Sequence, residues 1–220
     1  MDMIKQSTLN KVDDLIARYE NLAVCREDLV AAVTAVCAAY KNGGKLIVCG
    51  NGGSASDAEH IVGELMKGFL LPRKIEGGMA EKIKKLAPHS ADYFLENLQG
   101  ALPALSLVNQ VALNTAFAND QAPDLAFAQQ LFGMGNSGDV LLAISTSGNS
   151  ANVIYALDMA RVKGVKSIAL TGKSGGRIKK NAVADITICV PEDETYKIQE
   201  LHLPVYHMLC IAAENEFFGD

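Results

Sequence analysis

The stretch Lys45-Leu46-Ile47-Val48-Cys49 is a short apolar run, and Gly50-Asn51-Gly52-Gly53-Ser54-Ala55 follows it directly. An apolar run of this length next to turn residues is typical of a buried strand. The glycines let the backbone turn tightly where the strand ends, and Ser54 can cap a following helix. The stretch therefore predicts one strand–turn–helix unit.

Four more apolar runs follow along the chain, each flanked by turn residues, and the segments between them are long enough for helices. These runs are Ala104–Val108, Val140–Ile144, Ser167–Leu170 and Ile186–Val190. Continuous apolar runs are characteristic of parallel strands that are buried on both faces. The alternation predicts an α/β fold with a five-stranded parallel sheet flanked by helices on both faces.

The segments outside this alternation are three. Residues 1–42 are expected to form an N-terminal helical arm, as one helix or two from about Leu9 to Tyr40, which either pairs subunits or covers the sheet. Within the remaining unit, 43–220, the stretch from about 70 to 100 reads as a solvated helical excursion because prolines, glycines and a charge run interrupt it. The last helix should run from about Thr195 to Phe217, with a kink or a boundary near Glu200 because Pro204 lies inside it.

Composition limits the class of protein. The 220 residues are 49% hydrophobic and 20% charged, with a net charge of -5. This balance argues against a duplex-DNA-binding face and permits a small anionic ligand held by backbone N–H groups. No apolar stretch is long enough for a membrane span, and the N-terminal residues do not read as a signal peptide. Five cysteines without a C-x-x-C pair are expected to be reduced thiols, so we expect a cytoplasmic protein.

The glycine-rich turn formally matches the dinucleotide fingerprint G-x-G-x-x-A through Gly50, Gly52 and Ala55. That fingerprint also needs an acidic residue about 20 positions on, at the end of the next strand. Here the next strand begins only near Ala104, and no Gly-Lys-Ser/Thr follows as in a Walker loop. A nicotinamide-dependent dehydrogenase is therefore a poor interpretation of this turn.

A second polar turn, Ser145-Thr146-Ser147-Gly148-Asn149-Ser150, follows the run Val140–Ile144. Capping a helix needs only one such side chain, and here five of six positions carry a hydroxyl or an amide. A helix N-terminus offers unpaired N–H donors that favour an anion, and the hydroxyls complete a cage for phosphate oxygens. The two turns together predict a crevice for a small phosphorylated ligand at the carboxyl ends of parallel strands.

Histidine and glutamate spacing supplies a candidate reactive group. His60 and Glu64 are spaced i, i+4 and so share one helix face, and Gln199 and His207 can share a face of the last helix. Spacing alone does not single out the second pair, because Glu200 and His202 lie at similar angles. These side chains suit either a divalent metal or acid–base work around a carbonyl.

Three motifs resemble the sugar isomerase (SIS) domain of the phosphoheptose isomerases. They are Gly50-Asn51-Gly52-Gly53-Ser54-x-x-Asp57-Ala58-x-His60-x-x-x-Glu64-Leu65, Ser145-Thr146-Ser147-Gly148-Asn149-Ser150-Ala151-Asn152-Val153-Ile154, and Ile198-Gln199-Glu200-Leu201-His202-x-x-x-x-His207. They occur in the family's order and cover nearly the whole chain. The resemblance implies a ketose–aldose isomerase that converts sedoheptulose 7-phosphate to D-glycero-D-manno-heptose 7-phosphate through an enediol.

The resemblance also implies roles for individual residues. Glu64 would be the base and His207 its acid–base partner, and zinc, one per subunit, would be held by His60, Glu64, Gln199 and His207. The residues expected to bind the substrate are Asn51, Gly52, Gly53, Ser54, Asn119, Asp120, Ser145, Thr146, Ser147, Ser150 and Gln199. The family forms homotetramers with active sites shared between subunits, and no nucleic-acid or membrane partner is expected.

The sequence departs from the family pattern at three places. The stretch between Glu64 and Ala104 is longer than expected, the family's Glu-Leu-Thr-Gly-Arg becomes Glu64-Leu65-Met66-Lys67-Gly68, and the segment at Thr195-Tyr196 and Pro204 is unusual. These changes spare the acid and the base but alter the walls of the site. The alternative function is a non-catalytic SIS protein that binds a phosphosugar or associates with a replication initiator.

Overall fold

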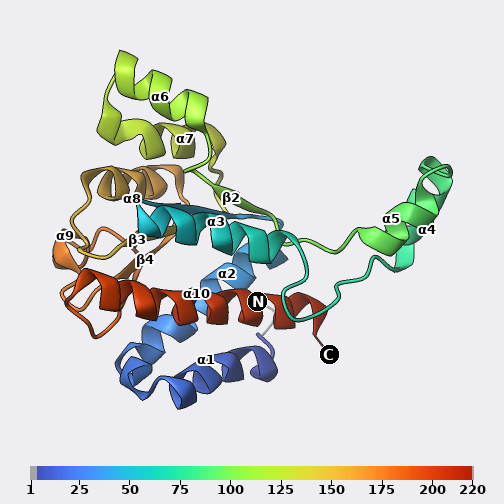
Figure 1. Ribbon diagram of the computed structural model, residues 1–220, viewed down its shortest axis with the longest axis horizontal. Helices are drawn as coiled ribbons and strands as arrows, with labels where there is room; N and C mark the ends of the chain where they lie inside the picture. Colours follow the sequence, from blue (N-terminus) through green and yellow to red (C-terminus); the bar gives the residue numbers. More distant parts are fainter. Residues whose placement is uncertain (1–3, 220) are drawn as a thin grey trace.

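The computed structural model describes residues 4–219, and its sheet confirms the predicted architecture (Figure 1). Five parallel strands lie in the order β2-β1-β3-β4-β5. Their bounds are β1 Leu46–Gly50, β2 Ala104–Ser106, β3 Val140–Ser145, β4 Lys166–Thr171 and β5 Ile186–Cys189. All five coincide with the apolar runs, because a strand covered on both faces needs apolar side chains at every position.

Helices connect these strands and precede them. The α-helices are α1 Gln6–Arg18, α2 Arg26–Lys41, α3 Gly53–Met66, α4 Gly77–Leu86, α5 Ala91–Asn97, α6 Val111–Asp120, α7 Ala126–Met134, α8 Ala151–Lys163, α9 Gly176–Lys180 and α10 Thr195–Phe218. Two 3-10 helices, η1 Glu20–Cys25 and η2 Pro123–Leu125, join α1 to α2 and α6 to α7. Within residues 4–219, none of the helices has the length and hydropathy that a membrane span requires.

The sheet separates two hydrophobic clusters, and alternate strand residues belong to opposite ones. Val48 and Leu142 pack into the cluster formed with α1, α2, α3 and α10. Ile47 and Leu141 pack into the cluster formed with α7, α8 and α9. This alternation is the two-residue period of a strand, and it explains why the runs are mostly apolar at successive positions.

The N-terminal helices belong to the core of this chain. α2 lies against the sheet, and the Cys25 thiol at its start donates to the carbonyl of Cys189 in β5 at 3.0 Å. α1 packs against α10 and α2 (Figure 1). The region therefore covers the sheet in this chain, and its role in pairing subunits stays a prediction.

The sequence predicts a kink or a boundary near Glu200; the last helix is continuous, so the boundary is wrong, and the kink stays a prediction. α10 runs for 24 residues with Pro204 inside it. Proline removes only one backbone hydrogen bond. Pro204 is buried, and this packing together with that of most of α10 holds the helix on both sides of the proline.

The stretch from about 70 to 100 forms the helical excursion that the sequence predicts. α4 and α5 project from the body of the molecule, and no residue of α4 is buried (Figure 1). The base of the excursion is closed by an antiparallel bridge between Lys74 and Gln99 and by a bond from the Gly100 amide to the Arg73 carbonyl, 2.7 Å long. Arg73 itself is buried, which the charge pattern did not predict.

The strand order determines where a ligand can bind. α3 leaves β1 on one face of the sheet, and α8 leaves the neighbouring strand β3 on the other. In this order the crevice at the carboxyl ends of β1 and β3 is the topological switch point, where open α/β sheets bind their ligands. Both polar turns of the sequence follow these two strands.

Candidate active site

The two polar turns are joined by a pair of side-chain amides. Asn51 follows β1, Asn152 lies in the first turn of α8, and each donates its Nδ2 to the Oδ1 of the other at 2.9 Å. The structure thus brings the glycine-rich and serine-rich turns together at the switch point, as predicted. Asn152 lies in one of the quoted motifs, yet only the fold shows that it bridges the turns.

The serine-rich turn is compact and supported from behind by α9. The hydroxyls of Ser145 and Ser150 lie 3.0 Å apart, and the Gly148 amide donates to the Ser145 carbonyl at 3.0 Å. Thr146 and Ser147 line a hollow of about 210 Å³ that also contains Lys173. A turn with hydroxyls at the start of α8 can hold a phosphate. The ammonium of Lys173 lies 3.5 Å from the carboxylate of Asp193, which lines the same hollow together with Glu192.

The glycine-rich turn is in contact with the last helix. A Cβ on Gly53 would lie 2.4 Å from Nε2 of Gln199, so the glutamine amide packs directly on this glycine. Gly52 has a φ of +57°, which explains a glycine at that position, and Ser54 is buried at the start of α3. Gln199 therefore lies beside the turn, in keeping with its predicted contact with the substrate.

Further along the same two helices, the structure brings together His60, Glu64 and His207. Nε2 of His60 lies 3.2 Å from a carboxylate oxygen of Glu64, and the rings of His60 and His207 pack edge to face with centroids 5.1 Å apart. Gln199 and His207 thus both face α3, as their spacing permits. His60 lies seven residues after Gly53, about 10 Å along the helix axis.

The electrostatic surroundings give the carboxylate and the imidazole different states. Burial raises the pKa of Glu64, but hydrogen bonds and charge from Lys67 and His60 outweigh it and hold that pKa below its ordinary value. Burial, followed by the charges of His60 and Arg18, lowers the pKa of His207 against the opposing effect of Glu64. Near neutral pH, Glu64 is a carboxylate and His207 an uncharged imidazole.

Three residues of this cluster escaped the sequence analysis. The Tyr206 hydroxyl lies 3.0 Å from Nδ1 of His60 and donates to the Asp57 carboxylate, so it links the two. Lys67 places its ammonium 2.9 Å from Glu64. Asp57 belongs to the first motif and Tyr206 precedes His207, but the packing of α3 against α10 was needed to show the contact.

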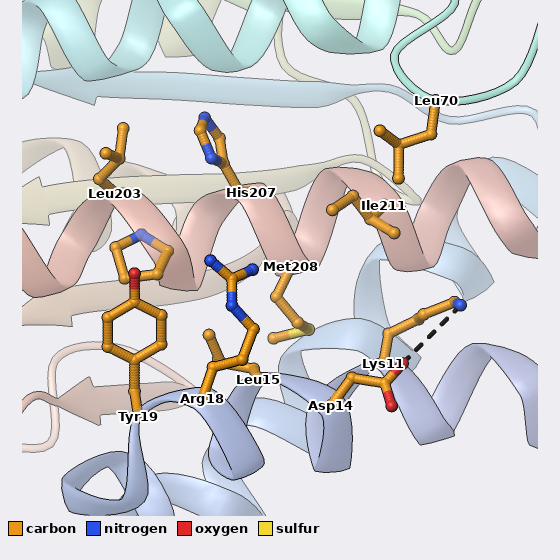
Figure 2. Close-up of a pocket in the computed structure, with 11 residues that line it drawn as sticks. Lys11, Asp14, Leu15, Arg18, Tyr19, Leu70, Leu203, His207, Met208 and Ile211 are labelled. Atoms are coloured by element: carbon orange, nitrogen blue, oxygen red, sulfur yellow. Dashed lines mark ion pairs between the residues drawn. The ribbon is translucent and has the colours of Figure 1, made fainter.

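His207 also borders a hollow of about 370 Å³ between α1 and α10 (Figure 2). Leu70 and Leu203 stand on the α10 side of the hollow, and Arg18 reaches up from α1 toward His207. This hollow is separate from the one at the serine-rich turn. It gives the acid–base cluster a mixed apolar and cationic surrounding.

The predicted pair Asn119 and Asp120 ends α6, which packs against η2 and α7. Both side chains are exposed, and Nδ2 of Asn119 donates to Asp120 at 2.8 Å. The structure shows no bond from either side chain to the two turns within residues 4–219. Their contact with the sugar stays a prediction.

The proposed zinc ligands are only partly gathered. Imidazole and carboxylate groups suit zinc, and Nε2 of His207 is buried without a hydrogen-bond partner. However, in the part of the chain that the structure describes, no three His, Cys, Asp or Glu side chains are arranged to hold a metal ion. Gln199 packs at Gly53, about 16 Å along α3 from Glu64. The arrangement therefore does not fit the four-residue zinc site, and zinc stays a prediction.

Comparison with known proteins decides the family. Two models described as SIS domains match residues 104–212 and residues 9–101. A phosphoheptose isomerase from Citrifermentans bemidjiense is 41% identical over 188 residues, covering 86% of this chain and 83% of the relative. This chain belongs to the phosphoheptose isomerase family. A second phosphoheptose isomerase, from Dechloromonas aromatica, is 37% identical over 220 residues, which are 100% of this chain and 99% of the relative.

Solved structures of phosphoheptose isomerases agree with the membership. The protein GmhA from Neisseria gonorrhoeae is 33% identical with a TM-score of 0.71, covering 92% of this chain and 94% of that one. The protein from Francisella tularensis is 32% identical with a TM-score of 0.73, covering 90% and 91%. The sugar isomerase domain of an RpiR transcription factor from Sphaerobacter thermophilus, at 17% identity and a TM-score of 0.54, shares the fold alone.

Proposed function

We propose that this chain is a phosphosugar isomerase that interconverts sedoheptulose 7-phosphate and D-glycero-D-manno-heptose 7-phosphate. The observation that carries the proposal is the course of α3 and α10. At one end these helices meet the two phosphate turns, and further along they bring Glu64 and His207 together. An extended sugar phosphate has its phosphate at one end and its reacting carbons near the other. It could therefore bind with the phosphate at the two turns and the reacting carbons beside Glu64 and His207.

The residues at the phosphate end of the site would bind the substrate and take no part in the proton transfers. Ser145, Ser147 and Ser150, together with the amides at the start of α8, would surround the phosphate oxygens, and Ser54 of the neighbouring turn would add a further hydroxyl. Gln199 contacts the turn and can hold a sugar hydroxyl. Fixing the phosphate in this way places the carbonyl end of the sugar along α3.

The proton transfers belong to the other end. The Glu64 carboxylate takes a proton from C1 of the ketose, and the electrons left behind form the C1–C2 double bond of an enediol. Uncharged His207 gives a proton to O2 as that oxygen gains charge and takes one from O1. Return of the proton from Glu64 to C2 completes the aldose.

The test is an NMR time course of the purified protein with sedoheptulose 7-phosphate. The wild-type protein should form the heptose 7-phosphate, and Glu64→Gln and His207→Gln should each lose at least roughly 100-fold in rate. The exposed residues Glu59 and His89 supply matched controls, because Glu59→Gln and His89→Gln should turn over normally.

A wild-type protein that folds, binds sugar phosphates and leaves them all unchanged would overturn the proposal. It would favour the alternative, a non-catalytic phosphosugar-binding or replication-initiator-associating protein. The paired acid and base argue against that alternative, since a sensor has no use for them.

Zinc, a homotetramer and a cytoplasmic location complete the proposal. For zinc, the unpartnered Nε2 of His207 is the supporting observation, whereas the position of Gln199 does not fit a four-residue site; metal analysis of the purified protein tests for one ion per subunit. The exposed apolar side chains of α6, Val111 and Leu113, support assembly with further copies and sites shared between subunits. The described cysteines are all free thiols, as expected in the cytoplasm.

A further inference from the structure

A buried ion pair lies directly behind the acid–base cluster. Nε of Arg73 is 2.7 Å from Oε1 of Glu214, and the two residues are only 3% and 1% exposed. Burying two charges costs free energy unless further hydrogen bonds satisfy them, so such a pair is a poor means of stabilisation alone. The positions of these further bonds indicate what the pair does.

Glu214 holds the loop that follows α3. Its Oε1 accepts the amide N–H of Phe69 at 2.8 Å, and its Oε2 accepts those of Leu70 at 2.8 Å and Leu71 at 3.2 Å. Three consecutive amides that donate to one carboxylate restrict the backbone conformation of the loop. The carboxylate thus fixes the backbone from Phe69 to Leu71 against α10.

Arg73 holds the end of α3 itself. Its Nη1 donates to the carbonyl of Leu65 at 2.7 Å and its Nη2 to the carbonyl of Glu64 at 3.2 Å. These are among the last carbonyls of the helix, which lack partners within it and favour a cation. Arg73 adopts a φ of +43°, a conformation that a non-glycine residue keeps only where its surroundings demand it.

Both anchored segments touch the site. Phe69 packs on the ring of His207, with centroids 5.4 Å apart. Leu70 lines the hollow beside His207 (Figure 2). One of the two backbone carbonyls that Arg73 binds belongs to Glu64, the proposed base.

We propose that Arg73 and Glu214 are positioning residues for the isomerisation: together they fix the end of α3 beneath Glu64 and hold Phe69 against His207. The inference rests on the proposed function of Glu64 and His207, and it adds two buried residues that touch no substrate. A displacement of about 1 Å at a reacting group can cost about 100-fold in rate. Loss of the pair should therefore lower kcat and leave the phosphate turns, and so KM, largely intact.

The chain offers a matched control on the same helix. Glu216 is also buried, 7% exposed, and its carboxylate binds Lys41 at 2.6 Å and the amide of Lys5 at 3.0 Å, away from the site. Glu214→Gln and Glu216→Gln each replace a buried carboxylate on α10 by an uncharged amide. We expect Glu214→Gln to lower kcat by roughly 10- to 100-fold with KM within about threefold, and Glu216→Gln to keep kcat within about twofold.

Kinetics are measured at a temperature where both variants are folded by circular dichroism. An unchanged kcat in Glu214→Gln, or an equal fall in both variants, would overturn the inference. If Glu214→Gln does not fold, Arg73→Lys replaces it, because lysine keeps the charge and loses the bonds to the end of α3. The same fall in kcat is then expected, and an unchanged kcat contradicts the inference.

A second readout needs no turnover. The imidazole resonances of His207, assigned with His207→Gln, should shift in Glu214→Gln because Phe69 moves, and should not shift in Glu216→Gln. A wild-type protein inactive on sedoheptulose 7-phosphate would refute the proposed function, and this shift would then still decide the positioning claim. Unmoved His207 resonances in Glu214→Gln would refute the positioning itself.

Discussion

At the scale of single residues, Glu64 and His207 differ in what surrounds them. Glu64 lies between the ammonium of Lys67 and the ring of His60, which favour the charged carboxylate. His207 is partly buried beside His60 and Arg18, and burial is the main reason why its pKa is lowered and the ring stays uncharged. These opposite preferences support the proposed roles of base and acid–base partner more directly than the spacing of the two residues does.

The Tyr206 hydroxyl is the residue-scale feature most open to a clean test. Tyr206→Phe removes one oxygen and leaves Asp57 and His60 without the bond between them. Because Asp57 and His60 are only partly buried, loss of these hydrogen bonds should lower the free energy of unfolding by about 1 kcal/mol. Urea denaturation measures this change. Tyr155→Phe, at a partly exposed tyrosine of α8, should change stability by less than about 0.5 kcal/mol, and an equal effect in both variants would contradict the account.

The site could be predicted from the sequence where the chemistry is local. The i, i+4 spacing of His60 and Glu64 and the five polar side chains after β3 need no knowledge of the fold. Contacts between distant segments, such as Tyr206 with His60, depend on how α10 packs against α3. Arg73 lies in a stretch that reads as solvated, yet its side chain is buried. Its partner Glu214 lies 141 positions away, so the sequence gives no sign of the pair.

At the scale of elements, α10 carries a buried histidine that makes the fold sensitive to acid. Burial lowers the pKa of His202 from 6.5 to about 4. The unfolded chain therefore binds this proton more readily, so stability is complete above about pH 6.5 and falls as the pH drops toward 4.

Replacing this histidine should remove the acid sensitivity that it causes. Between pH 7.5 and pH 5, the wild-type protein should lose about 2 kcal/mol of stability through His202. His202→Leu should lack this part of the loss, whereas His89→Leu at an exposed position should retain it. Urea denaturation at the two pH values measures the difference, and parallel losses in wild type and His202→Leu would contradict the account.

The contact between α9 and the serine-rich turn leaves no room for a side chain. A Cβ on Gly176 would lie 2.3 Å from the carbonyl oxygen of Ser147, and this glycine has a φ of +52°. Gly176→Ala should destabilise the protein by more than about 1 kcal/mol and raise KM for the sugar phosphate, because the turn must shift. In α7, a Cβ on Gly133 meets nothing within 4 Å. Gly133→Ala should therefore leave KM unchanged and alter the free energy of unfolding by no more than about 1 kcal/mol.

Elements were predictable where burial imposes a pattern. Each strand is covered on both faces and so appears as a continuous apolar run. The course of α10 through Pro204 was not predictable, because the packing that keeps the helix intact comes from α1, α2 and α3. The projecting helices α4 and α5 bury almost nothing, so the prolines, glycines and charge run of this stretch were enough to predict a helical excursion.

At the scale of the whole molecule, several large apolar side chains are exposed on the single chain. Val111 on α6 and Phe132 on α7 are more than half exposed. A homotetramer would have a mass of 4 × 23.4 = 93.6 kDa. Light scattering after size-exclusion chromatography should give this mass, and Val111→Glu should lower it by placing a charge in an apolar interface. A monomer of 23.4 kDa that turns over normally would contradict shared active sites.

The central claim is that Glu64 moves a proton between C1 and C2 of a sugar phosphate, and hydrogen exchange tests it most directly. Sedoheptulose 7-phosphate is incubated with the protein in D2O, and deuterium at C1 of the ketose and C2 of the aldose is followed by NMR. We expect deuterium at both carbons with the wild-type protein and with Glu59→Gln, and none above background with Glu64→Gln. Deuterium exchange by Glu64→Gln at the wild-type rate, or isomerisation by Glu64→Gln at the wild-type rate, would contradict this role of Glu64.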